Sequence, residues 1–182
     1  MSSDANVLVA VGLGSNLGDR ALHIARAVDG LGGLLGRLRC SAVYETVPEG
    51  DPDQPRFLNM CCVGRTRRTP RDVLRRLLEL EREEGRGREG DRRGPRTLDL
   101  DLLLFGDRVI REAGLEVPHP RLASRTFVLV PLAALVPNWI HPALGVPIAE
   151  LARRVGSEGV QPAADALPGL LRTAAAPTRE SE

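Results

Sequence analysis

The chain contains no lysine, and every one of its 25 basic residues is an arginine. This absence excludes mechanisms that need a lysine amine, such as a P-loop lysine or a Schiff-base lysine. Aromatic residues are only 3% of the chain, and the formal net charge is +1. A charge so close to zero provides no overall field that would attract nucleic acid or an anionic membrane surface.

Long hydrophobic runs are also missing. The longest, residues 127–136, is interrupted by Pro131 and is too short to span a bilayer. The N-terminus lacks a basic region followed by an apolar stretch, so we expect no signal peptide. The three cysteines, Cys40, Cys61 and Cys62, show no C-x-x-C spacing and lie in strand-like runs, which is typical of buried thiols in a reducing compartment. We therefore expect a cytoplasmic protein with no membrane partner.

The apolar pattern that is present predicts one α+β domain. Its expected strands and helices follow one another in the order β-α-β-β-α-β. The strands are expected at residues 6–12, 38–46, 57–65 and 98–105, and the helices at residues 20–30 and 70–84. This order is that of the ferredoxin-like fold, in which two helices cover one face of an antiparallel sheet.

The rest of the chain predicts smaller additions to this core. We expect a hairpin strand at 109–117 and short helices at 121–135 and 148–155. The predicted domain spans residues 1–155. Residues 156–182 are rich in Ala, Pro and Gly, and we expect a weakly ordered tail there.

Two aspartates interrupt the most apolar predicted strand, in the sequence "GPRTLDLDLLLFG". Because side chains alternate along a strand, Asp99 and Asp101 should share one face. Two unpaired carboxylates side by side are costly to bury, and a bound Mg²⁺ would offset that cost. Pairing with nearby arginines is an equally good explanation of the two aspartates taken alone.

An arginine-rich, glycine-rich stretch, residues 81–96, precedes this strand. The planar guanidinium group suits phosphate oxygens, so the arginines of this stretch are candidates for contacting a metal-bound nucleotide. Alternatively, these arginines only offset neighbouring acidic residues in a solvated loop, which explains Arg96 less well because Pro95 restrains it. The earlier segment "GLGSNLGDR" has neither the G-x-G-x-x-G nor the P-loop spacing and predicts a tight turn instead.

Two further segments carry residues suited to binding a flat heterocycle. Phe57 and Asn59 should share a face of their strand and offer a ring for stacking and an amide for polar edges. "VPHPRLASRTF" brings His119, Arg125 and Phe127 into one short connection. A core phenylalanine, a turn asparagine and a structural histidine are the plainer explanations of these residues.

Taken together, these segments resemble the 6-hydroxymethyl-7,8-dihydropterin pyrophosphokinase family. The resemblance is carried by "GLGSNLGDR", "SAVYETVPEGDPDQPRFLN", "EREEGRGR", "RRGPRTLDLDLLLFG" and "VPHPRLASRTFVLVPL", which stand in the family's order. It implies a ferredoxin-like enzyme of folate synthesis that transfers pyrophosphate from ATP to the pterin hydroxymethyl group and releases AMP.

The same resemblance implies roles for individual residues. Asp99 and Asp101 would hold two Mg²⁺ ions, and Arg86 and Arg96 would be the catalytic arginines of the loop. The implied ATP contacts are Glu81, His119 and Arg125, and the implied pterin contacts are Thr46, Val47, Pro48, Phe57, Asn59 and Phe127.

The partners expected from this assignment are ATP and a reduced pterin, with no nucleic acid, and we expect a monomer. The main competing hypothesis is a ferredoxin-like RNA-binding module, which would need exposed aromatics on a basic sheet face. A second alternative, a non-catalytic family member, is disfavoured because both aspartates and both loop arginines are present.

Overall fold

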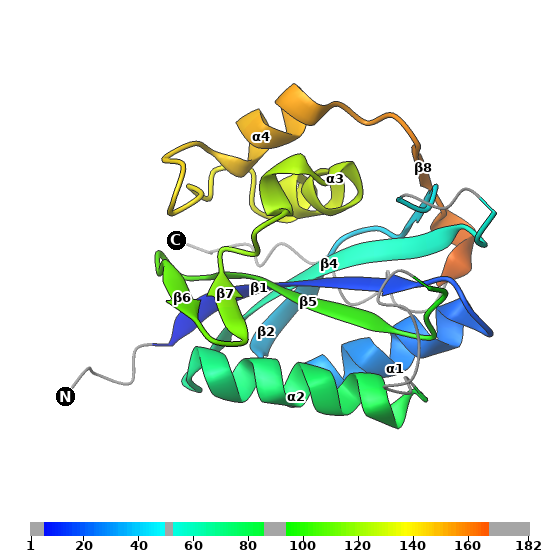
Figure 1. The fold of residues 1–182 in the computed structure, drawn as a ribbon, viewed down its shortest axis with the longest axis horizontal. Helices are drawn as coiled ribbons and strands as arrows, with labels where there is room; N and C mark the ends of the chain where they lie inside the picture. The colour runs from blue at the N-terminus through cyan, green and yellow to red at the C-terminus, as the bar shows by residue number, and fades with distance from the viewer. Residues whose placement is uncertain (1–5, 50–52, 86–93, 168–182) are drawn as a thin grey trace, which may run out of the picture.

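The protein is described by a computed structural model that covers residues 6–49, 53–85 and 94–167. An antiparallel sheet lies between two layers of helices (Figure 1). The elements of the central region are β1 (Val7–Ser15), α1 (Arg20–Gly32), β2 (Gly36–Cys40), β3 (Tyr44–Thr46), β4 (Phe57–Thr66), α2 (Pro70–Glu83) and β5 (Asp99–Phe105). Within the sheet the strand order is β5-β1-β4-β3-β8, where β8 spans Val160–Pro162, and β2 also pairs with β4.

Both predicted helices of the central region begin where the sequence indicates. The Asp19 side chain accepts a hydrogen bond from the Leu22 amide at 3.0 Å and caps α1. Thr69 caps α2 in the same way through the Asp72 amide, and Pro70 occupies the first turn. These caps satisfy backbone donors that have no partner inside the helix.

The strand expected at residues 38–46 is instead divided into β2 and β3, which both pair with β4. The division falls at Ser41. Its hydroxyl accepts a hydrogen bond from the Cys61 amide at 3.0 Å, and its own amide donates to the Cys61 carbonyl at 2.9 Å. A side chain therefore replaces one backbone acceptor of the ladder, and the regular strand stops there.

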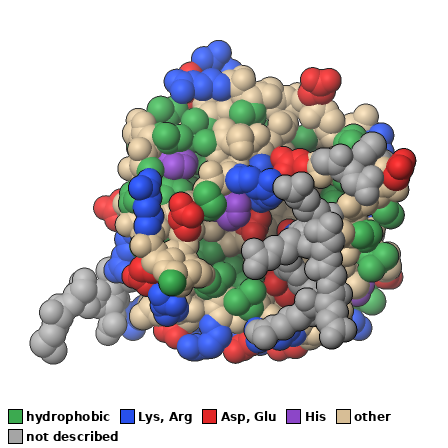
Figure 2. Space-filling view, viewed as in Figure 1, with side chains coloured by type: hydrophobic (Ala, Val, Ile, Leu, Met, Phe, Trp, Pro, Cys, Tyr) green, Lys and Arg blue, Asp and Glu red, His purple; other side chains and the backbone are tan. Residues whose placement is uncertain are grey.

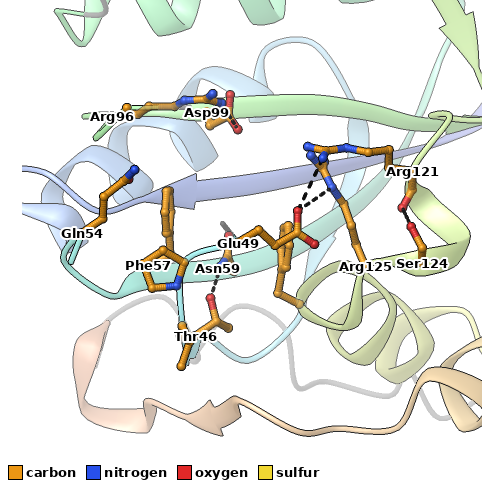
Figure 3. A pocket seen from close by; sticks show the side chains of 14 residues that line it. Thr46, Glu49, Gln54, Phe57, Asn59, Arg96, Asp99, Arg121, Ser124 and Arg125 are labelled. Carbon is orange, nitrogen blue, oxygen red and sulfur yellow. Dashed lines mark hydrogen bonds and ion pairs between the residues drawn. The ribbon is translucent and has the colours of Figure 1, made fainter. Parts of the chain in front are cut away.

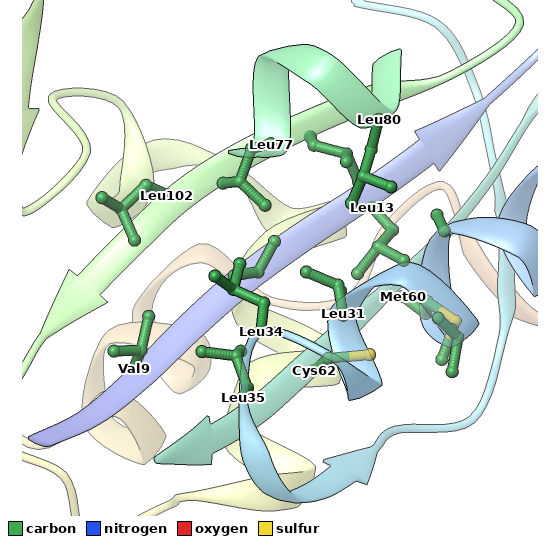
Figure 4. Close-up of a cluster of buried hydrophobic side chains, with 14 of the residues drawn as sticks. Val9, Leu13, Leu31, Leu34, Leu35, Met60, Cys62, Leu77, Leu80 and Leu102 are labelled. Atoms are coloured by element: carbon green, nitrogen blue, oxygen red, sulfur yellow. The ribbon is translucent and has the colours of Figure 1, made fainter. Parts of the chain in front are cut away.

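Each face of the sheet carries its own hydrophobic cluster, because residues alternate between the faces along every strand. On β1, Val9, Val11 and Leu13 face α1 and α2, where they pack with Leu31 and Leu77 (Figure 4). The opposite face packs against α3 (Thr126–Leu135) and α4 (Ile148–Val155). The expectation of helices on one face is thus incomplete, since α3 is apolar almost throughout and needs its own burial.

The remaining elements extend the domain. The predicted hairpin is formed by β6 (Ile110–Glu112) and β7 (Leu115–Val117), and η1 (Leu122–Ser124) precedes α3. Regular structure continues past residue 156, where we expected a weakly ordered tail, because β8 (Val160–Pro162) pairs with the exposed edge of β3 and η2 (Ala164–Ala166) follows it. In the described part of the chain, no helix has the length and apolarity needed to cross a membrane.

Candidate active site

Two glycines of β1 lie between the residues of the candidate site. Gly14 lies in register between Asn59 of β4 and Asp99 of β5, and Gly12 lies opposite Asp101. A Cβ atom on Gly14 would come within 2.6 Å of the Asn59 side-chain oxygen. The Asn59 amide can therefore lie over β1 only because residue 14 has no side chain. We call this side of the sheet the pocket face.

A cavity of about 400 Å³ opens on the pocket face (Figure 3). The sequence-predicted site residues that line it are Thr46, Val47, Pro48, Phe57, Asn59, Arg96, Asp99, Arg125 and Phe127. These residues come from β3, β4, β5, α3 and the connections between them, so the fold joins segments that are far apart in the sequence.

One wall of the cavity is built for hydrogen bonding beside aromatic rings. The Asn59 side-chain nitrogen donates to the Thr46 hydroxyl at 2.6 Å, and both residues are buried. Figure 3 shows this pair next to Phe57. The bond fixes the orientation of the Asn59 amide, whose oxygen and second N–H point to groups other than Thr46. Such a wall can form hydrogen bonds with the polar edge of a flat ring and contact its face.

The opposite wall combines Asp99 with arginines, and Asp101 lies next to it on the same face of β5, outside the residues that line the cavity. The Arg96 guanidinium lies 2.7 Å from the Asp99 carboxylate, and that of Arg125 lies 2.9 Å from Asp101. This pairing is the arginine explanation considered for the sequence. The two carboxylates nevertheless project from the same side of β5, and each side chain keeps at least a quarter of its surface exposed.

The donor set of this wall fits Mg²⁺. Carboxylate oxygens are hard ligands, and Mg²⁺ is usually held by one or two carboxylates together with water and substrate phosphates. Within the described residues, no group of three or more His, Cys, Asp or Glu side chains gathers as a metal site. The pair of aspartates therefore suits an ion that arrives with a phosphate ligand better than a permanently bound structural ion.

Arg125 is the most buried cation of the site. Its side chain is 11% exposed and also lies 3.6 Å from the Glu49 carboxylate. The Nε atom is buried and makes no hydrogen bond in the described structure. The guanidinium carbon lies 5.3 Å from the centre of the Phe127 ring. The Nε atom is the one that faces the Glu49 carboxylate, at 3.6 Å and beyond hydrogen-bonding distance, so this buried guanidinium suits an anionic ligand such as phosphate in the cavity.

His119 is held next to Asp101 but does not line the cavity. Its amide donates to the Leu103 carbonyl at 2.9 Å, and its Nε2 lies 3.6 Å from the Asp101 carboxylate. The ring Nδ1 accepts from the Arg121 amide at 3.2 Å, which places the proton of the neutral ring on Nε2. Burial lowers the pKa of His119, and the Asp101 charge opposes that shift.

Among the described residues, three of the predicted site residues do not line the cavity: His119 and Asp101, which lie beside each other, and Glu81. Glu81, for which we expected an ATP contact, is only 3% exposed, and its carboxylate accepts a hydrogen bond from the Leu100 amide at 2.8 Å. It reaches the back of β5 because α2 packs on the face opposite the pocket. Arg86 lies outside the described residues.

The sequence interpretation missed Asn16, a buried residue of the turn after β1. Its oxygen accepts from the Arg96 amide at 2.7 Å, and its nitrogen donates to Gln54 at 3.3 Å and to the Pro55 carbonyl at 3.1 Å. Asn16 thus ties the segment before β5 to the segment before β4. Both segments border the cavity, so this turn positions the two walls relative to each other.

Other cavity residues were also missed: Glu49, Gln54, Arg121 and Ser124. Each lies inside a segment that the sequence analysis had already singled out, but polar residues in a connection are too common to be selected individually. On the face seen in Figure 2, the described basic and acidic side chains are intermixed around the site. A broad basic surface, which an RNA-binding module would need, is not formed by the described residues on this face.

Paired carboxylates, phosphate-type arginines and an amide–aromatic wall around one cavity are the features of a phosphoryl-transfer enzyme acting on a flat polar substrate. Comparison with known proteins narrows this class. The family model for 7,8-dihydro-6-hydroxymethylpterin-pyrophosphokinase matches residues 10–137. The chain belongs to this family, which confirms the assignment made from the sequence motifs.

Individual relatives agree with the family match. The chain is 41% identical to the 2-amino-4-hydroxy-6-hydroxymethyldihydropteridine pyrophosphokinase of Synechocystis over 162 residues, which is 88% of this chain and 80% of the relative. It is 41% identical to the Aquifex aeolicus enzyme of the same name over 142 residues, which is 78% of this chain and 88% of the relative.

The fold also matches a solved structure. A crystal structure of Plasmodium falciparum HPPK-DHPS with pteroate superposes with a TM-score of 0.69 at 16% identity. The match covers 86% of this chain and 48% of the Plasmodium chain, so this chain spans about half of that protein. At this identity the likeness concerns the fold, and it supports a mixed α/β domain with an antiparallel sheet.

Proposed function

We propose that this chain is a pyrophosphokinase that transfers the terminal diphosphoryl group of ATP to the hydroxymethyl oxygen of 6-hydroxymethyl-7,8-dihydropterin. The bond from that oxygen to the β-phosphorus forms, the bond between the β-phosphorus and the α,β-bridging oxygen breaks, AMP leaves, and the hydroxyl proton is released. The product is an intermediate of folate synthesis. One observation carries the proposal: a wall suited to the pterin and a wall suited to the triphosphate border the same cavity.

The amide–aromatic wall binds the pterin in this proposal. Phe57 and Phe127 contact the faces of the ring, and Asn59 hydrogen-bonds its edge. The Asn59–Thr46 bond holds the amide before the substrate arrives, so less conformational entropy is lost on binding. The segment Thr46, Val47 and Pro48 supplies backbone groups at the same edge.

The aspartate–arginine wall binds the triphosphate. Asp99 and Asp101 would hold two Mg²⁺ ions, which when bound would neutralise phosphate charge. Arg96 and Arg125 then face phosphate oxygens instead of carboxylates, because a guanidinium group bonds either anion with the same forked geometry. These fixed cations stabilise the charge that develops in the transition state. The His119 Nε2, which carries the ring proton, lies 3.6 Å from the Asp101 carboxylate beside this wall.

Further properties follow from this proposal. We propose a ferredoxin-like topology, and its support is the strand order β5-β1-β4 with β2 and β3, counted as one strand, at the far side. A cytoplasmic monomer without a nucleic-acid partner, and a catalytic role for Arg86, stay predictions.

The reaction products test the proposal directly. The chain is incubated with ATP, Mg²⁺ and the reduced hydroxymethylpterin, and the nucleotides are separated. AMP formed in equal amount with the pterin diphosphate is the expected result. ADP as the only nucleotide product would show an ordinary kinase and overturn the assignment.

A substitution at Asp101 tests its proposed role in holding Mg²⁺. Asp101→Asn keeps the shape of the side chain and removes its charge, so we expect turnover to be lost while pterin binding remains. Asp107→Asn changes an exposed aspartate just beyond the same strand and serves as the matched control. Near-normal turnover of Asp101→Asn at low Mg²⁺ concentration would rule out the proposed metal role.

A further inference from the structure

Two cysteines from neighbouring strands meet on the side of the sheet that faces α1 and α2. Cys40 ends β2, and Cys62 lies directly opposite it in β4. Their Sγ atoms are 2.9 Å apart, and both thiols are free. This pair, which we call the cross-strand thiol pair, has no part in the proposed transfer reaction.

The backbone geometry at this pair suits a covalent link. Ser41 and Cys61, one position further along, are joined by a backbone hydrogen bond of 2.9 Å. Because hydrogen-bonded and non-hydrogen-bonded pairs alternate along an antiparallel ladder, Cys40 and Cys62 form a non-hydrogen-bonded pair. Opposite residues in such pairs have Cα atoms roughly 4.5 Å apart, within the range that disulfides bridge.

The third cysteine is excluded from the link by the alternation of side chains. Cys61 points to the pocket face, where its thiol is fully buried and lies 3.5 Å from the Val128 carbonyl. Cys62 belongs to the opposite cluster, as Figure 4 shows. The sheet itself therefore separates the cross-strand thiol pair from both Cys61 and the cavity.

We propose that the cross-strand thiol pair is a redox-sensitive modification site that small-molecule disulfides, such as oxidised glutathione, convert into a Cys40–Cys62 disulfide. Cys40 attacks the oxidant to give a mixed disulfide and one thiol. Cys62 then attacks the Cys40 sulfur, the second small thiol leaves with the Cys62 proton, and the protein disulfide remains. Two protein thiols are oxidised and one disulfide is reduced, so electrons and protons balance.

The surroundings fit this order of events. Cys40 is half-buried and reachable from solvent, whereas Cys62 is buried. The hydrogen bond with Cys62 lowers the pKa of Cys40, which raises the share of the attacking thiolate, and the same bond raises the pKa of Cys62. In a reducing compartment the pair stays reduced and becomes oxidised only when disulfide oxidants accumulate.

The link would close a ring around residues 41–61, which include Thr46, Phe57 and Asn59 of the cavity. Because the strands are already in register and the thiols project from the other face, the link needs little movement of the pocket face. The oxidised chain should unfold at a higher temperature, since cross-linking lowers the entropy of the unfolded chain. Its turnover should be unchanged.

Mass spectrometry of the full-length chain tests the site. The native chain is treated with oxidised glutathione, free thiols are alkylated after denaturation, and the unreduced peptides are analysed. In Cys61→Ala we expect the Cys40–Cys62 link, and in Cys62→Ala we expect none. A persistent glutathione adduct on Cys40, a link to Cys61, or no modification would overturn the proposal. If Cys61→Ala does not fold, the linked peptide of the wild-type chain is analysed instead. Its fragmentation in the mass spectrometer at the bond between residues 61 and 62 shows which of the two cysteines is linked to Cys40.

Thermal unfolding supplies a second readout. We expect the unfolding temperature to rise on oxidation and to return after treatment with a dithiol reductant. Cys40→Ser, at the half-buried end of β2, should show no oxidant-dependent rise. A wild-type unfolding temperature that stays the same or falls after the link has formed, or a large loss of turnover, would show that the native strands do not accommodate the disulfide.

Discussion

Replacing Glu81 by alanine tests how the strand that carries the two aspartates is held in place. The Glu81 carboxylate is 3% exposed and accepts a 2.8 Å hydrogen bond from the amide of Leu100, the residue between Asp99 and Asp101. Among the described strands, β5 pairs with β1 alone and lies at the edge of the sheet. Glu81 therefore supplies an acceptor that none of these strands provides on the other side of β5.

The expected loss of stability follows from two contributions. A hydrogen bond to a charged group contributes about 1.5–3 kcal/mol, and the one buried methylene group that alanine lacks adds about 0.8 kcal/mol. We expect Glu81→Ala to lower the free energy of unfolding by about 2–4 kcal/mol. For a chain of this size that corresponds to a decrease of roughly 4–16 °C in the unfolding temperature.

The assay is urea unfolding combined with steady-state kinetics. Glu79→Ala on the same helix is the control, because the Glu79 side chain is 41% exposed and makes only a surface ion pair with Arg76. Glu81→Gln keeps an oxygen acceptor and should recover part of the lost stability. Turnover of Glu81→Ala should also fall. The Leu100 amide loses its acceptor, and the two aspartates on either side of it are then held less firmly.

A different result would refute this reasoning. If Glu81→Ala unfolds within about 0.5 kcal/mol of Glu79→Ala and only the KM for ATP rises, then Glu81 contacts the nucleotide and not the strand.

Three other changes have expected outcomes. Gly14→Ala places a Cβ atom 2.6 Å from the Asn59 oxygen and should weaken pterin binding at least tenfold in a binding titration, about 1.4 kcal/mol, whereas Gly12→Ala, whose Cβ meets side-chain atoms at 3.5 Å, should not. Equal affinities of the two variants would contradict this account. Leu77→Ala, at a position with no exposed surface, should cost about 2–5 kcal/mol in urea unfolding, and a smaller cost would mean that the core refills the cavity. Burial lowers the pKa of His141 from its ordinary value of 6.5, so the unfolded chain binds more protons and stability should fall as pH decreases through about 6.5. In unfolding titrations at pH 7.5 and about pH 5.5, His141→Asn should show a smaller decrease in the free energy of unfolding than the wild-type chain. An equal decrease in both chains would show that other groups cause it.

Much of the fold could be predicted from local patterns. The sequence signals of α2 are local. They are Thr69, Pro70 and the helical spacing of the apolar residues that follow, because capping and periodicity act within a few residues. The division of the strand at residues 38–46 could not be predicted. It depends on a bond between Ser41 and Cys61, which are distant in sequence.

The candidate site shows the same division. The placement of the two aspartates of β5 was predictable because side chains alternate along a strand, which puts both acids on one face. Asn16 was not recognisable, because its role is to join the segments next to Arg96 and Gln54, and only the folded chain brings those segments together.

By itself, the sequence determined the chemistry available to this protein. It places two carboxylates on one strand face, its basic residues are all arginines, and its motifs identify the family. The tertiary structure alone decided which arginine pairs with which aspartate, that Glu81 supports the strand from behind, and which cysteines meet. The reason is physical. Side-chain identity and spacing set what a residue can do, whereas its partners depend on strand register and helix packing between segments far apart in the chain.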